Sequence, residues 1–217
     1  MSIRAARIIA MILCFVLGAP AFAAQDPRDG DVRDIKIGSR AAELSGDSYT
    51  GLRCEVSGQP LESWLDYRQC SPDSRGLHAI RFEFLQTSQA LASLNDRWQG
   101  TKIAGHPVLL SVGLDGQGEV QAIRIETDPE ARIYLRKKAF LLGIRIRERY
   151  GEDGWTCSGQ PIRPGQSEIG GMFVHQTCEK TAEGRRLVVE TSLYRDVGQT
   201  GRDFVSSTRF DIVREGL

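Results

Sequence analysis

The sequence predicts an α+β fold made of two tandem related units of antiparallel sheet with packed helices, each unit with one disulfide. Three observations support this prediction. The peptide Ser57–Leu61 (SGQPL) is nearly repeated as Ser158–Ile162 (SGQPI), and each copy follows one cysteine and precedes another. Two β-rich runs surround Asp115–Gly118 (DGQG), which is a strong hairpin signal. A long helical pattern then covers residues 128–151.

On this interpretation the chain has four segments. Residues 1–23 are a signal peptide and 24–34 a flexible N-terminal segment. Residues 35–100 are the first α+β unit, and 101–217 are the second α+β unit, which contains the long basic helix. The roughly 194 residues left after the signal are enough for one large domain or two small ones.

The first 23 residues have the three-part layout of a secretory signal. Arg4 and Arg7 give a positive start, Ile8–Leu17 is an apolar run, and Ala23 ends a small-residue cleavage site, with Ala24 as the other candidate. An apolar run of about ten residues is too short to span roughly 30 Å of hydrocarbon. No long apolar run follows it. We therefore expect a periplasmic protein of a Gram-negative bacterium, with no transmembrane segment after signal removal.

Removal of the signal also removes Cys14 and leaves an even number of cysteines, which in an exported chain predicts disulfides. Three pairings are possible. We favour the two that lie inside one copy of the repeat, each of which stabilises its unit by about 3 kcal/mol. The favoured disulfides are Cys54–Cys70 and Cys157–Cys178.

A zinc site is the alternative use of these cysteines, because His175 lies three residues before Cys178. Zinc sites usually contain cysteines two to four residues apart, and no two cysteines here have that spacing. We therefore predict no metal and no other cofactor.

In the first unit, Lys36–Gly46 predicts a short helix and Leu61–Cys70 a strand. The run Gly76–Phe84 predicts a second strand, and Ser88–Trp98 a helix that joins the two units. The two copies keep the order tyrosine, cysteine, SGQP, cysteine and strand. Their second cysteines are differently spaced, which we attribute to a turn-rich insertion at Pro164–Gly171.

In the second unit, Val108–Leu114 and Glu119–Glu126 are the strands of the predicted hairpin, and Arg185–Arg195 is a later strand. The acidic residues around DGQG lack the alternating ligand pattern of a calcium loop, so we expect a plain turn. A helix should begin at Asp128 as N-cap and end at Gly151.

That helix has two apolar stripes, which predicts that it lies between two packed layers. One stripe contains Leu135, Ala139, Leu142, Ile146 and Tyr150, and the other contains Ile133, Phe140 and Ile144.

The same helix is strongly basic. Removal of Arg4 and Arg7 from the 28 basic residues leaves 26 against 28 acidic ones, so the mature chain has no excess positive charge and nothing indicates a nucleic-acid partner. The helix, however, has seven basic residues and two acidic ones. We predict an anion- or partner-binding face at Arg136, Lys137, Arg145 and Arg149. The alternative is that these side chains cover apolar surface and pair with acids on the sheet.

Catalytic signals are few. His78, His106 and His175 lie in separate segments, and none has a partner at an informative spacing. No nucleophile elbow, metalloprotease motif or phosphate-binding loop is present. We therefore predict a non-enzymatic periplasmic binding or accessory protein that recognises another periplasmic protein or an anionic ligand. The alternative is a periplasmic hydrolase with His106 or His175 as its base.

A short segment supports the binding interpretation. Ile35–Leu44 (IKIGSRAAEL), followed by hydrophobic strands, resembles the opening of small periplasmic α/β modules of the SmpA/BamE and β-lactamase-inhibitor-protein type. The tandem layout with one cystine per copy is also similar to the inhibitor protein. The resemblance covers about ten residues. It implies short helices packed on an antiparallel sheet and a protein partner.

Overall fold

The computed structural model describes residues 30–85 and 101–217. The predicted signal peptide, most of the predicted N-terminal segment 24–34 and the predicted helix Ser88–Trp98 lie outside the described residues. Across the described ranges, no helix combines the length and the apolar character needed to cross a membrane.

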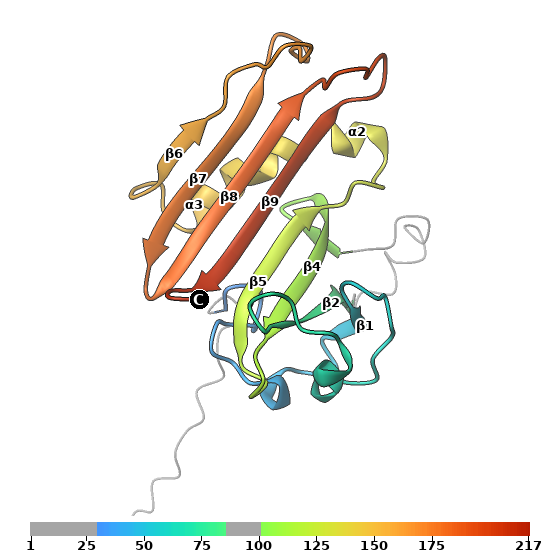
Figure 1. The fold of residues 1–217 in the computed structure, drawn as a ribbon, viewed down its shortest axis with the longest axis vertical. Coiled ribbons are helices and arrows are strands. Elements are labelled where there is room, and N and C mark those ends of the chain that lie inside the picture. Colours follow the sequence, from blue (N-terminus) through green and yellow to red (C-terminus); the bar gives the residue numbers. More distant parts are fainter. Residues whose placement is uncertain (1–29, 86–100) are drawn as a thin grey trace, which may run out of the picture.

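All described strands belong to one nine-stranded sheet, and every pairing is antiparallel. The order is β1-β2-β4-β5-β9-β8-β7-β6, and β3 pairs with β4 (Figure 1). The strands are β1 Tyr49–Cys54, β2 His78–Phe84, β3 Thr101–Ile103, β4 His106–Leu114, β5 Val120–Thr127, β6 Thr156–Gly159, β7 Val174–Ala182, β8 Arg185–Tyr194 and β9 Val205–Arg214. The helical segments are η1 Ala41–Glu43, η2 Trp64–Gln69, α2 Ile133–Arg136, η3 Ala139–Leu141 and α3 Leu142–Arg149.

The predicted α+β fold of two tandem units is wrong, because strands from both halves of the chain form this single sheet. The decisive pairing is β5 with β9, which sets Ile123 opposite Ile212 and Ile125 opposite Phe210. All four side chains are buried. The pairing satisfies two strand edges that separate units would leave open, and it merges the apolar faces of both halves into one core.

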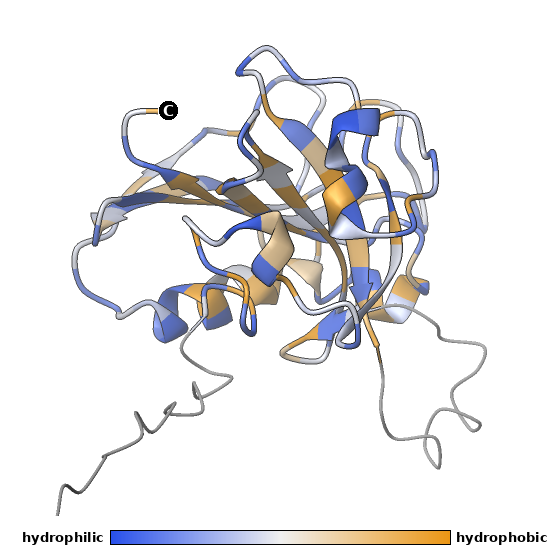
Figure 2. Ribbon diagram, turned by 90° about the horizontal axis from the view of Figure 1, so that it is seen from below, coloured by the Kyte–Doolittle hydropathy of each residue, from blue (hydrophilic) through white to orange (hydrophobic). Residues whose placement is uncertain are grey.

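The core follows rows of side chains that cross the sheet. One row runs Leu110, Ile125, Phe210 and Val189 on β4, β5, β9 and β8, because residues paired across antiparallel strands share a face. All four are at most 4 % exposed. Figure 2 shows apolar residues along the strands and also on helical segments.

Both predicted disulfides, Cys54–Cys70 and Cys157–Cys178, are present, but they join different kinds of element. The first links the end of β1 to the residue after η2, whereas the second links directly paired residues of β6 and β7. The predicted tandem repeat is therefore wrong. The two similar peptides also differ in structure.

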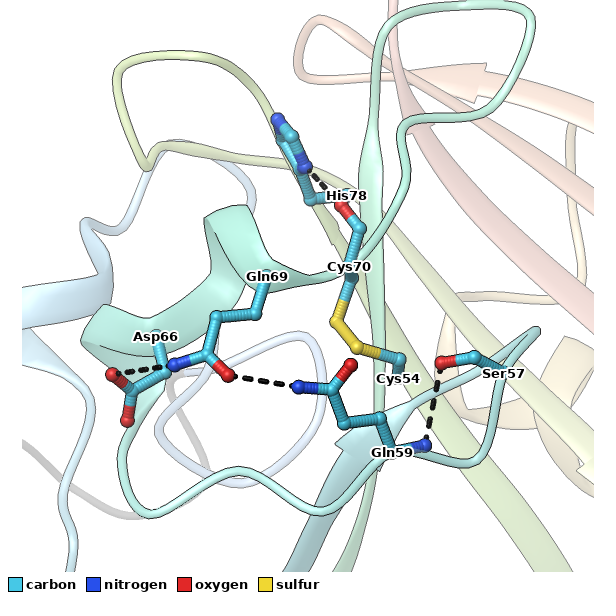
Figure 3. Close-up of a disulfide and its surroundings, with 7 residues drawn as sticks. All are labelled: Cys54, Ser57, Gln59, Asp66, Gln69, Cys70 and His78. Atoms are coloured by element: carbon cyan, nitrogen blue, oxygen red, sulfur yellow. Dashed lines mark hydrogen bonds between the residues drawn. A yellow bond between two sulfur atoms is a disulfide. The ribbon is translucent and has the colours of Figure 1, made fainter.

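The first SGQP peptide is a turn. Gly58 has φ +72°, and the Gln59 carbonyl accepts the Cys54 N–H at 2.8 Å. The Gln59 side chain donates to Gln69 Oε1 at 3.0 Å, which ties the turn to η2 beside the first disulfide (Figure 3). In the second copy, Ser158 and Gly159 are extended residues of β6. Strand pairing with β7 thus overrides the turn preference of the same residues.

The predicted strand Leu61–Cys70 is instead the short helix η2. Ser63 and Asp66 form a capping box, in which the Ser63 N–H donates to Asp66 Oδ2 at 2.9 Å. Trp64 and Tyr67 are both buried, because a 3₁₀-helix has three residues per turn and aligns positions i and i+3. Trp64 packs edge-on against Phe82 of β2, with 5.3 Å between ring centroids.

The predicted helix Lys36–Gly46 shrinks to the single turn η1. Gly38, at φ +92°, donates its N–H to the Val120 carbonyl at 2.8 Å. The Val120 N–H in turn donates to the Ser39 carbonyl at 2.8 Å. The pairing with the start of β5 therefore uses backbone N–H and carbonyl groups that a longer helix would need for its own hydrogen bonds.

The predicted basic helix is shorter than expected and divided into α2, η3 and α3. Asp128 accepts the Glu130 N–H in a turn, and the first helical residue is Ile133. The predicted stripe is buried at Ala139, Leu142 and Ile146. The opposite stripe does not pack on a second layer, because Ile144 is 44 % exposed. The helical segment therefore covers one face of the sheet and does not separate two layers.

Two close contacts hold the η3–α3 part of this segment against the sheet. Thr208 Oγ1 of β9 donates to the Ala139 carbonyl at 2.9 Å. A Cβ atom at Gly143 would lie 2.4 Å from Thr191 Oγ1 of β8, so only glycine permits this approach.

Candidate functional site

A cleft of about 750 Å³ lies between α3, the N-terminal segment and the end of β2 with the β3–β4 turn. We call it the α3 cleft. Its floor is apolar and comes from four parts of the chain. The floor residues, all at most 4 % exposed, are Val32, Ile125, Leu142, Ile146 and Phe210.

The N-terminal segment forms one wall because polar contacts fix Asp31 against α3 and β8. Its carboxylate forms an ion pair with Arg185 and accepts the Ile37 N–H at 2.9 Å. Its carbonyl accepts the Tyr150 hydroxyl at 2.9 Å. The Arg149 guanidinium donates to the Gly30 carbonyl at 3.2 Å. These contacts fix the position of Val32 in the floor of the cleft.

Tyr150 closes the end of the cleft beside the last turn of α3. Its ring lies 5.2 Å from that of Phe210. Burial, with the Asp31 charge as a smaller contribution, raises the pKa of Tyr150 to about 12. The phenol is therefore neutral at physiological pH, and its O–H is already donated to Asp31.

The opposite rim is formed by β2 and the β3–β4 turn. The Arg33 guanidinium carbon lies 3.7 Å from the centroid of the Phe84 ring, within the range of a cation–π contact. Ile103 and Ala104 continue this rim. Phe84 and Ile103 are half-buried, so the apolar lining reaches the mouth.

Three arginines surround the mouth: Arg33, Arg145 and Arg149. Arg145 and Arg149 are four residues apart on α3 and therefore lie on the same side of that helix. Arg145 pairs with Glu148 at 3.0 Å, and its side chain is 65 % exposed. The acids of the lining, Asp31 and Glu148, are both in ion pairs.

The pKa of His106 is affected by the positive charges near the mouth of the cleft. Burial lowers the pKa of its imidazole below the ordinary 6.5, and the charges of Arg145 and Lys138 lower it further. Cations on α3 and just before η3 therefore act on the side of the cleft where β3 turns into β4.

The structure brings together two of the four predicted recognition residues. Arg145 and Arg149 line the α3 cleft, whereas Arg136 and Lys137 belong to the α2 turn and do not. Arg136 donates to the Pro129 carbonyl at 3.5 Å and faces the Phe204 ring at 5.8 Å. Lys137 is exposed.

Sequence reasoning missed Arg33, Phe84 and Ile103 as parts of the site. Arg33 lies in the segment that was expected to be flexible. Phe84 is the last residue of β2 and Ile103 the last residue of β3, and the pairing of both strands with β4 brings them to the same rim. The apolar residue at the end of β2 was the one signal available.

The three histidines do not form a catalytic arrangement. His78 Nδ1 lies 2.6 Å from the Cys70 carbonyl, and the His175 ring stacks on Tyr194 at 5.2 Å. Within residues 30–85 and 101–217, no histidine forms a hydrogen bond or an ion pair with a carboxylate. Over the same ranges, no group of three or more potential metal ligands is present.

No protein-family model, curated protein or solved structure matches this chain. The resemblance of Ile35–Leu44 to SmpA/BamE-like and inhibitor-protein-like modules therefore stays a prediction.

Proposed function

We propose that this chain is a non-enzymatic binding protein whose α3 cleft takes an amphiphile with one apolar tail and an anionic head group. The observation that carries the proposal is the combination of an apolar floor with an arginine-bearing mouth in one cleft. A volume of about 750 Å³ is within the range of small-molecule sites, which are mostly apolar with a few fixed polar groups.

The apolar floor and the arginine-bearing mouth each favour one part of such a ligand. An alkyl tail on Leu142, Ile146 and Phe210 would leave water at a gain of about 0.8 kcal/mol for each buried CH₂ group. A carboxylate or phosphate at the mouth would meet Arg33 and Arg145, whose guanidinium groups can each donate two hydrogen bonds to two oxygens of such an anion. A cationic or neutral head group lacks that attraction.

The proposal includes export to an oxidising compartment, the periplasm of a Gram-negative bacterium. Two disulfides support it, because such bonds persist in oxidising surroundings. The signal-like composition of residues 1–23 supports it independently. A hydrolase with a histidine base has no specific observation in its favour.

Calorimetric titration with alkyl carboxylates of increasing length tests the proposal. Affinity should rise about fourfold for each added CH₂ until the cleft is filled. An alkyl trimethylammonium of equal length should bind at least about tenfold more weakly. No binding of any chain length, or equal binding of both head groups, would contradict the proposal.

Variants locate the binding in the cleft. Ala104→Trp places a large ring at the exposed rim and should reduce affinity for every chain length. Arg145→Glu should weaken binding of the carboxylates about tenfold and make it less sensitive to salt. Lys137→Glu makes the same charge change on α2, outside the cleft, and is the matched control. If Lys137→Glu and Arg145→Glu have the same effect, the mouth of the cleft does not recognise the head group.

A further inference from the structure

A second cavity, of about 330 Å³, shares no lining residue with the α3 cleft. It lies where β1, β2 and the β3–β4 hairpin approach the segment that leads from β5 into α2. Arg53, Arg81, Lys102 and Glu83 line it from the sheet, and Asp128, Glu130 and Arg132 line it from that segment. We call it the Arg81 pocket.

Among the residues that the structure describes, Arg81 is a half-buried cation with no ion-pair partner within 4.0 Å. Its Nε is buried and has no hydrogen-bond partner. Its direct neighbour across β1 is Arg53, so two like charges face each other. Its direct neighbour on the other side, on β4, is Ser111, which has no charge.

The nearest carboxylates of the sheet are already used. Glu83 lies 3.7 Å from the Arg53 guanidinium. Glu55 accepts the Ser111 hydroxyl at 3.2 Å and faces Arg124 at 4.0 Å. Arg124 also pairs with Asp211 at 2.7 Å.

An uncompensated, half-buried cation opposes stability, and such departures from good local design occur mainly at functional sites. The Arg81 guanidinium can donate two parallel hydrogen bonds to one oxyanion. Arg53 and Lys102 add two cations on the same wall. A doubly charged phosphate group fits this wall better than a single carboxylate.

The other wall contributes two carboxylates beside the Arg132 side chain. Asp128 accepts the Glu130 N–H through Oδ1 at 2.8 Å, and its second oxygen is not used in that bond. The Glu130 carboxylate lies on the same wall. Carboxylate oxygens accept hydrogen bonds from hydroxyl groups and repel a second phosphate.

We propose that the Arg81 pocket binds a small polyol phosphate, with the phosphate at Arg53, Arg81 and Lys102 and hydroxyl groups at Asp128 and Glu130. The volume of the pocket is at the lower end of the range for small-molecule sites. The site is separate from the amphiphile cleft and does not depend on that proposal.

Calorimetry at constant ionic strength tests the site with glycerol 3-phosphate, inorganic phosphate and glycerol as probes. Glycerol 3-phosphate should bind most tightly, inorganic phosphate more weakly, and glycerol not measurably. Arg81→Gln should weaken binding of glycerol 3-phosphate about tenfold or more, and Lys102→Gln by a smaller factor. Equal affinity of the wild type and Arg81→Gln would overturn the site.

Two comparisons control for general charge effects. Arg75→Gln removes an exposed arginine that pairs with Asp73 at 2.9 Å, and it should leave the affinity unchanged. Arg145→Glu in the α3 cleft should also leave it unchanged, which separates the two proposals. Equal binding of inorganic phosphate and glycerol 3-phosphate would overturn the assignment of a polyol.

Thermal unfolding provides a second readout. Without phosphate, Arg81→Gln should melt at or above the wild-type temperature, because the substitution removes a like-charge opposition. Glycerol 3-phosphate should raise the melting temperature of the wild type and not that of Arg81→Gln. A lower melting temperature of the variant in phosphate-free buffer would assign Arg81 a structural role and overturn the proposal.

Discussion

Cys157 and Cys178 lie directly opposite each other on β6 and β7, and the Arg147 guanidinium lies 3.6 Å from one sulfur and 3.7 Å from the other. Cys157 is exposed on a strand at the edge of the sheet, whereas Cys54 and Cys70 are each 2 % exposed. The two disulfides therefore differ in their access to a reductant and in the charge near their sulfurs.

We expect the Cys157–Cys178 disulfide to be reduced first. A thiol reductant can reach Cys157, and the Arg147 cation stabilises the thiolate that leaves. Timed reduction, alkylation and mass mapping should find labelled Cys157 and Cys178 before labelled Cys54 and Cys70. Arg147→Met should slow the first step. Earlier labelling of the buried pair would contradict this prediction.

Asp31→Ala should lower the free energy of unfolding by about 3 kcal/mol. The Asp31 side chain is 1 % exposed, and the substitution leaves the Ile37 N–H without its partner and Arg185 with only its exposed partner Glu183. Urea unfolding measures the change. The control is Glu179→Ala, which breaks an exposed pair between Glu179 of β7 and Arg186 of β8 and should cost at most about 1 kcal/mol. Equal losses would show that the N-terminal wall is not held by Asp31.

Gly143→Ala should destabilise the protein although alanine favours a helix by about 1 kcal/mol over glycine. The new Cβ would lie 2.4 Å from Thr191 Oγ1 and would lift α3 from β8. Thermal unfolding measures the loss. Addition of Thr191→Ala removes the clashing hydroxyl and should restore part of the stability. A more stable Gly143→Ala would mean that α3 is not packed this closely on the sheet.

The pKa of His106 should lie below 6.5, and Arg145→Glu should raise it, because the substitution replaces a repelling charge with an attracting one. NMR titration of the imidazole measures both values. The unfolded chain binds the proton more readily, so the contribution of His106 to stability is complete above about pH 6.5 and declines as the pH falls below it. His106→Gln should remove this part of the pH dependence. A pKa of 6.5 or higher in the wild type would contradict the prediction.

Part of the candidate site was visible in the sequence. Arg145 and Arg149 stand out because their segment has a local excess of basic residues, which needs no three-dimensional information. Arg33 and Phe84 could not be connected to them. Both lie far from α3 in the chain, and local sequence patterns do not show which distant segments share a cleft.

The sequence by itself determined the features that depend on neighbouring residues. The hairpin around DGQG forms β4 and β5, the runs near Gly76 and Arg185 form β2 and β8, and the buried stripe of α3 is at the predicted positions. Each of these follows from side-chain periodicity or turn chemistry within about ten residues. The cysteine pairings were also predicted correctly, although the repeat from which they were predicted is wrong.

Only the tertiary structure decided that β5 pairs with β9 and that one sheet replaces two units. It also decided that one SGQP peptide forms a turn and the other a strand, and that the helix begins at Ile133. The physical reason is that every strand offers the same backbone donors and acceptors at its edges. The choice of neighbour therefore depends on which pairing buries the most apolar surface, as Ile125 does against Phe210, and that choice is made by the whole chain.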